Sequence, residues 1–177
     1  MLGDATNADM RIPALVITLL AFGGCASKAP LEAARIHGIA ASDAPTIDAC
    51  WRKVLTSPPH QALKARTGDH ADSPTAAMKS NPEKATPREG AQLLSLQQEY
   101  LAPCRKMALE SAAKVHPAIV AILTDSYARA DANTAQLVAH QITWGEYVSE
   151  NQAIVTHRRA ELLAAGESMQ RQHAAPR

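Results

Sequence analysis

The sequence predicts an all-α protein, a small antiparallel bundle of three to four helices with a disordered N-terminal tether and a mobile mid-chain loop. Aromatic residues make up 3% of the 177 residues, although hydrophobic residues make up 46%. That composition favours a core of alanine and leucine packed between helices. In several segments the apolar residues recur at spacings of three and four, and no segment alternates β-branched and polar residues as a strand would.

The first element, residues 1–24, reads as an export signal. Met10 and Arg11 precede an apolar run from Ile12 to Gly24, which as a helix would be about 20 Å long at about 1.5 Å per residue. This is too short for a hydrocarbon core about 30 Å thick and fits the apolar region of a signal peptide. The residues before Met10 contain acids and no base, so we expect translation to begin at Met10.

The signal ends at Phe22-Gly23-Gly24-Cys25, which resembles the bacterial lipobox. The resemblance implies that Cys25 carries fatty-acyl chains such as palmitate and anchors the protein to a membrane. Ala26 follows the cysteine where inner-membrane lipoproteins carry Asp, which implies the outer membrane, facing the periplasm. The alternative is an ordinary signal cleaved near Ala26 or Ser27, which would release a soluble protein.

Acylation of Cys25 would leave two further cysteines, Cys50 and Cys104. In an oxidising periplasm we expect them to form a disulfide. The alternative is a metal site, but two cysteines without a histidine at short spacing are a poor ligand set for zinc. We therefore predict no metal and no cofactor.

Three segments follow the lipobox. Residues 25–45 are rich in alanine and proline and are expected to form a tether with some helical character. Residues 46–56 form a short helix with an apolar face, in which Trp51 fills the core. Residues 57–85 contain many prolines and polar residues, so we expect a flexible loop with a solvated His60.

Residues 86–170 are expected to form the bundle itself. Thr86 and Glu89 have the spacing of a capping box, with a proline at the first helical position. The apolar stripe that follows includes Cys104, and Pro103 within it should kink the helix. A second long helix restarts at His116-Pro117.

A helical hairpin is predicted near the C-terminus. Thr143 and Glu146 form a second capping box, and Ile142 with Tyr147 forms a hydrophobic staple. The preceding helix must end near His140, so the chain reverses within a few residues. The final helix is expected to run to about Gln170, with residues 171–177 as a frayed tail.

The hairpin sequence AQLVAHQITWGEYVSENQAIVTHRRAELL resembles the short C-terminal oligomerisation domain called SHOCT. In that family a glycine-isoleucine-threonine turn precedes an acidic and aromatic helix start, whereas this chain has His140-Gln141 before the isoleucine. The whole chain also resembles proteobacterial lipoproteins that carry an ITWGEY-type segment, a class that implies no reaction.

No residue set predicts catalysis. Glu146 could act as a general base, but its position in a capping box explains it without chemistry, and Trp144 with Tyr147 is expected to pack the base of the hairpin. The net charge of +1 gives no electrostatic case for nucleic acid. We expect a non-enzymatic envelope lipoprotein that binds an envelope protein. The alternative is a periplasmic lipoprotein that binds a small ligand or a metal in a cleft between bundle and tether.

Overall fold

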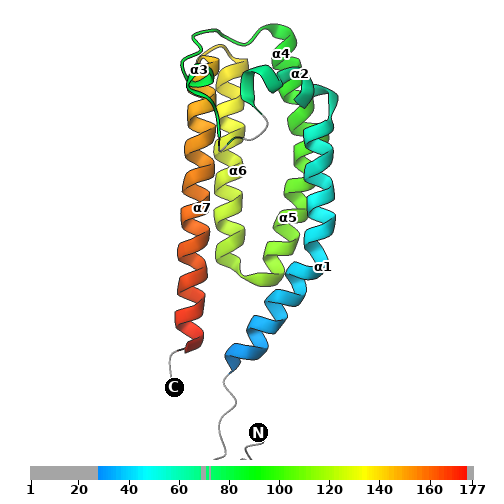
Figure 1. Cartoon of the computed structure of the whole chain (residues 1–177), viewed down its shortest axis with the longest axis vertical. Coiled ribbons are helices and arrows are strands. Elements are labelled where there is room, and N and C mark those ends of the chain that lie inside the picture. The colour runs from blue at the N-terminus through cyan, green and yellow to red at the C-terminus, as the bar shows by residue number, and fades with distance from the viewer. Residues whose placement is uncertain (1–27, 69–70, 72, 175–177) are drawn as a thin grey trace, which may run out of the picture.

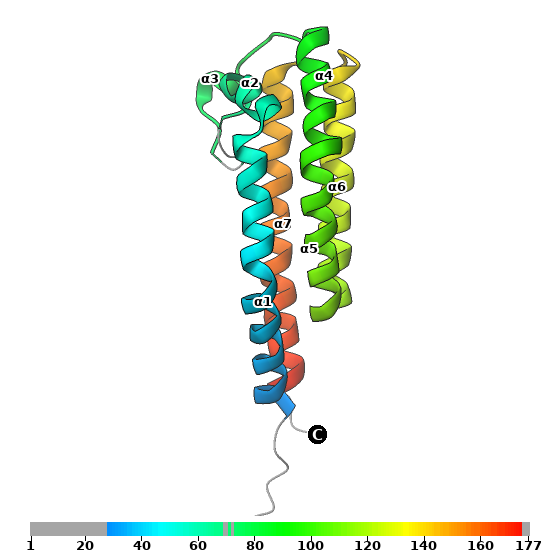
Figure 2. The same ribbon diagram turned by 90° about the vertical axis from the view of Figure 1, so that its right-hand side faces the viewer.

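The computed structural model describes residues 28–68, 71 and 73–174, and within them every regular element is helical (Figure 1). The predicted all-α bundle is confirmed. The long helices form four rods, which run side by side in both views (Figures 1 and 2). They are α1 (Lys28–Thr56), the continuous α4 (Pro87–Ser95), η1 (Leu96–Leu101) and α5 (Ala102–Val115), then α6 (Pro117–Val138) and α7 (Trp144–Ala174).

The rods form a four-sided bundle in which α6 packs against α7 and α5, and α1 packs mainly against α5. Two short helices, α2 (Pro58–Thr67) and α3 (Ala76–Lys79), lie at the end where α4 and α7 begin (Figure 2). The central apolar cluster lies at the same end. Its buried members come from α2, the segment before α4, and the helices α4, α6 and α7: Leu63, Ala85, Leu93, Leu137, Trp144, Tyr147 and Val148.

The expected tether at residues 25–45 is wrong for its described part, because residues 28–56 form one helix. The long-range contacts of α1 with the end of α5 explain the difference. Arg35 donates to the carbonyl oxygen of Lys114 at 2.5 Å, and the Lys114 ammonium pairs with Asp43 at 2.8 Å. Pro45 lies inside the helix on its exposed side. Tertiary packing on α5 therefore outweighs the local helix-breaking signal.

The flexible loop expected at residues 57–85 is also wrong, because α2 and α3 lie within it. Ser57 caps α2 by accepting from the His60 amide at 3.4 Å, and Pro58 occupies the first turn of that helix. Proline is compatible with that position, so here it begins a helix instead of breaking one. Leu63 is fully buried in the core cluster, and His60, expected to be solvated, is 8% exposed.

Pro103 changes the hydrogen-bond pattern of the helix turn before it. Because proline has no amide hydrogen, one bond of the regular helical ladder is lost at that point. Residues 96–101 adopt π-helical pairing, in which the Ala102 amide donates to the carbonyl oxygen of Gln97, five residues back. The rod continues through this wider turn from α4 into α5 (Figure 2). A proline inside an apolar stripe is therefore accommodated by a π segment.

The two helical reversals follow the sequence closely. His116 caps α6 by accepting the Ala118 amide at 3.1 Å on its imidazole Nδ1, with Pro117 at the first helical position. At the other end of α6, His140 has φ +58°, and the Gln141 amide donates to the carbonyl oxygen of Gln136. This is a Schellman-type ending with histidine where glycine is usual. The predicted reversal near His140 is confirmed, and α7 continues to Ala174, past the predicted end at Gln170.

Candidate functional site

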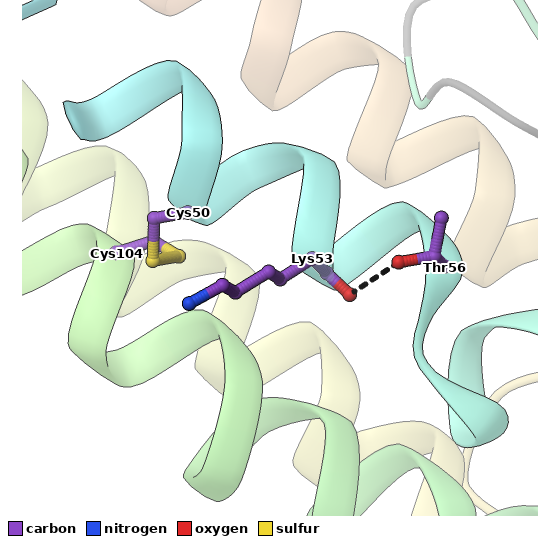
Figure 3. The surroundings of a disulfide bond; sticks show 4 residues. All are labelled: Cys50, Lys53, Thr56 and Cys104. Carbon is purple, nitrogen blue, oxygen red and sulfur yellow. Dashed lines mark hydrogen bonds between the residues drawn. A yellow bond between two sulfur atoms is a disulfide. The ribbon is translucent and has the colours of Figure 1, made fainter. Parts of the chain in front are cut away.

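A disulfide joins Cys50 on α1 to Cys104 on α5 (Figure 3), as predicted. The two Cα atoms are 5.6 Å apart, and Cys104 has no exposed surface. Two turns of α1 separate this bond from the helix end, where the Thr56 hydroxyl donates to the carbonyl oxygen of Lys53 at 3.4 Å. The disulfide ties the last two turns of α1 to the first turn of α5.

The predicted acylation site, Cys25, lies outside the described residues, as do the signal residues 1–24 and the tail residues 175–177. Acylation of Cys25 therefore stays a prediction. Among the described residues, none of the helices combines the length and apolar character that a membrane crossing requires.

The first predicted capping box is present at the start of α4. The Thr86 amide donates to the Glu89 carboxylate at 2.8 Å, and the Glu89 amide donates to the Thr86 hydroxyl at 3.2 Å. Arg66 from α2 donates to the same carboxylate at 2.8 Å and also pairs with Glu83. Its guanidinium carbon lies 5.9 Å from the centre of the Trp144 ring. The cap therefore also fastens α2 to the bundle.

The second predicted capping box is present at the start of α7. The Thr143 amide donates to the Glu146 carboxylate at 2.7 Å, and the Glu146 amide donates to the Thr143 hydroxyl at 3.2 Å. The bond from the Thr143 amide holds the pKa of Glu146 below its usual range, since it favours the charged form. Glu146 is therefore an ionised cap at neutral pH, and its hydrogen bonds are those of a helix start.

Residues Trp144 and Gly145 dock a neighbouring segment of the chain onto the start of α7. The Trp144 amide donates to the carbonyl oxygen of Glu83 at 2.8 Å, and the Gly145 amide donates to that of Asn81 at 2.9 Å. A Cβ atom at Gly145 would lie 2.3 Å from the carbonyl oxygen of Lys79. Only glycine allows this approach. The sequence indicates this close approach at one position, Gly145. The capping box already completes the start of α7, so the glycine is not needed as a cap.

The base of the hairpin is packed as predicted. Trp144 is fully buried and Tyr147 is 8% exposed. The two rings meet edge to face, with centroids 5.6 Å apart and planes at 87°. Ring pairs of this geometry are favourable because a positive ring edge meets a negative face.

A pocket of about 470 Å³ lies between the four rods, and sequence reasoning gave no sign of it at this place. Its apolar walls come from four elements, with Val54 on α1, Leu93 on α4, Leu96 on η1 and Ile154 on α7. Trp51, expected to fill the core, is only partly buried and lines this pocket. The volume lies within the range of small-molecule sites.

One end of the pocket is cationic. Arg105 on α5 lies with its guanidinium carbon 4.9 Å from the centre of the Tyr127 ring and pairs with Asp131 at 2.5 Å. Burial raises the pKa of Tyr127, and the charges of Arg158 and Arg105 act on it in the opposite direction. Both arginines therefore lie near the same phenol. The Arg105 charge has a partner in Asp131, whereas Arg158 has no ion pair in the described part of the chain.

The same region contains an unsatisfied hydroxyl. Ser126 lines the pocket one residue before Tyr127 and is 4% exposed. Its Oγ atom has no hydrogen-bond partner among the described residues. A buried hydroxyl without a partner is costly, so a polar ligand group here would be stabilising.

The described residues contain no group of three or more His, Cys, Asp or Glu side chains arranged to hold a metal ion. Comparison with known proteins adds no relative, since no family model, curated protein or solved structure matches the chain.

Proposed function

We propose that this chain is a non-enzymatic lipoprotein of the bacterial envelope, anchored in the outer membrane through acylated Cys25 and acting as an interaction module in the periplasm. The observation that carries the proposal is the Met10–Cys25 sequence, with its single cation, short apolar run and lipobox-like ending. The Cys50–Cys104 disulfide supports it, because structural disulfides persist in oxidising compartments.

The arrangement of the rods supports a defined orientation relative to the membrane. Cys25 precedes the first residue of α1, Lys28, by three positions. The start of α1 and the end of α7 lie at one end of the bundle, and α2, α3 and the turn between α6 and α7 lie at the other (Figure 1). A helix of the length of α7 extends about 45 Å. An anchored bundle therefore presents the end with α2 and α3 to its partner.

Intact-mass measurement of protein recovered from membranes tests the anchor. We expect a chain that begins at Cys25, carries the mass of the acyl chains and lacks two hydrogens because of the disulfide. In the full chain, Cys25→Ser should remove the acyl mass and release the protein from membranes, whereas the matched change Cys50→Ser should leave acylation intact. An unprocessed chain with three reduced cysteines inside the cell would contradict the proposal.

Crosslinking tests the partner-binding role. A photoreactive residue placed at exposed Ala77 on α3 should capture one envelope protein, and the same residue at exposed Gln172 near the end of α7 should not. Equal capture from the two positions would contradict the assigned orientation.

Binding of a small ligand is a second candidate function, favoured by the pocket and its cationic end. Reversible binding by an anchored protein and binding of a partner protein are compatible, since the pocket lies between the rods and the proposed partner surface lies at their end.

A further inference from the structure

We propose that the pocket between the four rods binds one unesterified fatty acid, with its carboxylate held at Arg158 and Ser126 and its acyl chain against the apolar walls. The proposal deepens the second candidate function and names its ligand class. It does not depend on acylation of Cys25.

The pocket has the polarity of a molecule with a charged head and an apolar tail. α4 and α7 begin at the same end of the bundle and run in the same direction (Figure 1). Along the continuous rod of α4, η1 and α5 the lining passes from Leu93 to Arg105, and along α7 it passes from Val148 to Arg158. The end near the core cluster is therefore lined by apolar side chains together with His60 and Thr67 of α2, and the arginines line the opposite end.

The charge of the pocket favours an anion. The described lining residues include three arginines, Arg105, Arg158 and Arg159, and no carboxylate. Asp131 neutralises Arg105 at 2.5 Å and is itself held by Gln97 at 2.5 Å. Arg158 is half-buried without such a counter-charge in the described part of the chain. A half-buried guanidinium is stabilised by a carboxylate, which it can bind through two hydrogen bonds.

Ser126 supplies a second, independent contact. Its hydroxyl is buried, lines the pocket and has no partner among the described residues, so it can donate to a carboxylate oxygen. Ser126 and Tyr127 occupy adjacent positions on α6 and both line the pocket, as do Arg105 and Arg158, whose charges act on the Tyr127 phenol. The two groups together specify a carboxylate more closely than either would alone.

The size of the pocket favours a single acyl chain. Its volume of about 470 Å³ is toward the small end of the range for ligand pockets, which extends to about 1,000 Å³. A diacyl phospholipid presents the same head-and-tail chemistry with twice the apolar volume. A free fatty acid therefore suits the space better.

Calorimetric titration of dodecanoate below its critical micelle concentration tests the proposal. The protein is the full chain with Cys25→Ser, which removes the candidate acylation site and the need for detergent. We expect saturable binding of one dodecanoate. Arg158→Gln should weaken it about 10- to 100-fold, the range expected for loss of a charge-assisted hydrogen bond. The control Arg171→Gln, an exposed arginine on the same helix, should leave it unchanged.

Two further measurements distinguish binding of the carboxylate from binding of the acyl chain. Dodecanol has the same chain without the charge, so it should bind the Cys25→Ser protein more weakly than dodecanoate does. Ala130→Leu places a larger side chain in the pocket and should weaken both ligands, with folding checked by circular dichroism. If that variant unfolds, the smaller change Ala130→Val replaces it.

The following results would overturn the proposal: absence of saturable binding, equal affinities for dodecanol and dodecanoate, or equal weakening by Arg158→Gln and Arg171→Gln. Unchanged binding in the folded pocket-filling variant would do the same. The protein could also take up phosphatidylglycerol from vesicles. If excess dodecanoate did not displace that bound lipid, the pocket would be assigned to a membrane lipid instead. Each of these results leaves the proposed anchor at Cys25 intact, since the protein tested lacks that cysteine.

Discussion

Replacement of Gly145 by alanine is expected to undock the segment 79–83 from the start of α7. An added Cβ atom would lie 2.3 Å from the Lys79 carbonyl oxygen and 2.9 Å from that of Asn81, and both are backbone atoms that cannot rotate away. Moving the segment breaks two hydrogen bonds, those that the Trp144 and Gly145 amides donate. At about 0.5–1.5 kcal/mol each, their loss lowers the free energy of unfolding by about 1–3 kcal/mol.

Urea unfolding followed by circular dichroism measures this loss in the oxidised protein. Gly166→Ala is the matched control, because it lies on the same helix and an added Cβ there meets no atom within 4 Å. Alanine is the better helix former, so Gly166→Ala should stabilise the protein by up to about 1 kcal/mol. If Gly145→Ala proves as stable as Gly166→Ala, the close approach does not constrain the fold and the reasoning is refuted.

Three other changes probe the disulfide, the second cap and the turn. Replacing both Cys50 and Cys104 by alanine should lower the free energy of unfolding, measured in urea, by up to about 4 kcal/mol, because the bond closes a loop with a sequence separation of 54. An unchanged urea midpoint would contradict a stabilising role for the disulfide. Because the folded-state pKa of Glu146 is lowered, its stabilisation is present above about pH 4.5 and is lost as pH falls below that value. The stability difference between wild type and Glu146→Gln should therefore shrink between pH 5 and pH 3, and a constant difference would contradict the cap assignment. His140→Gly should raise the free energy of unfolding by about 0.5–1 kcal/mol, since glycine tolerates φ +58°, and a lower thermal midpoint would argue otherwise.

The features that sequence reasoning predicted correctly depend on residues close together in the chain or on covalent chemistry. The boxes at Thr86 and Thr143 each need only a partner three positions away, and the hydrogen bonds found are the expected ones. The Cys50–Cys104 pairing followed from counting cysteines after the lipobox-like sequence had accounted for Cys25. A capping box can be predicted from sequence because both of its hydrogen bonds form between residues three positions apart.

The features that it missed depend on contacts distant in sequence. Residues 28–45 carry weak helical signals, and their contacts with the end of α5, such as Arg35 with Lys114, cannot be read from the local pattern. The prolines of residues 57–85 predict a loop, but proline is also compatible with the first turn of a helix, and at Pro58 the Ser57 cap distinguishes the two. The pocket is missed for the same reason, because its lining residues extend from Trp51 to Arg159 in the sequence.

The disulfide and the pocket are linked by the packing of α1. This helix contributes Trp51, Val54 and Leu55 to the pocket wall and packs more extensively on α5 than on α7. Cys50 lies one residue before Trp51, so the covalent bond to Cys104 fixes this wall against α5. The core cluster, at the end with α2 and α3, is built without any member from α1. Two different interactions therefore hold the helices of the bundle together. Apolar packing around Trp144 holds α2, α4, α6 and α7 together, while the disulfide holds α1, which forms one wall of the pocket, against α5.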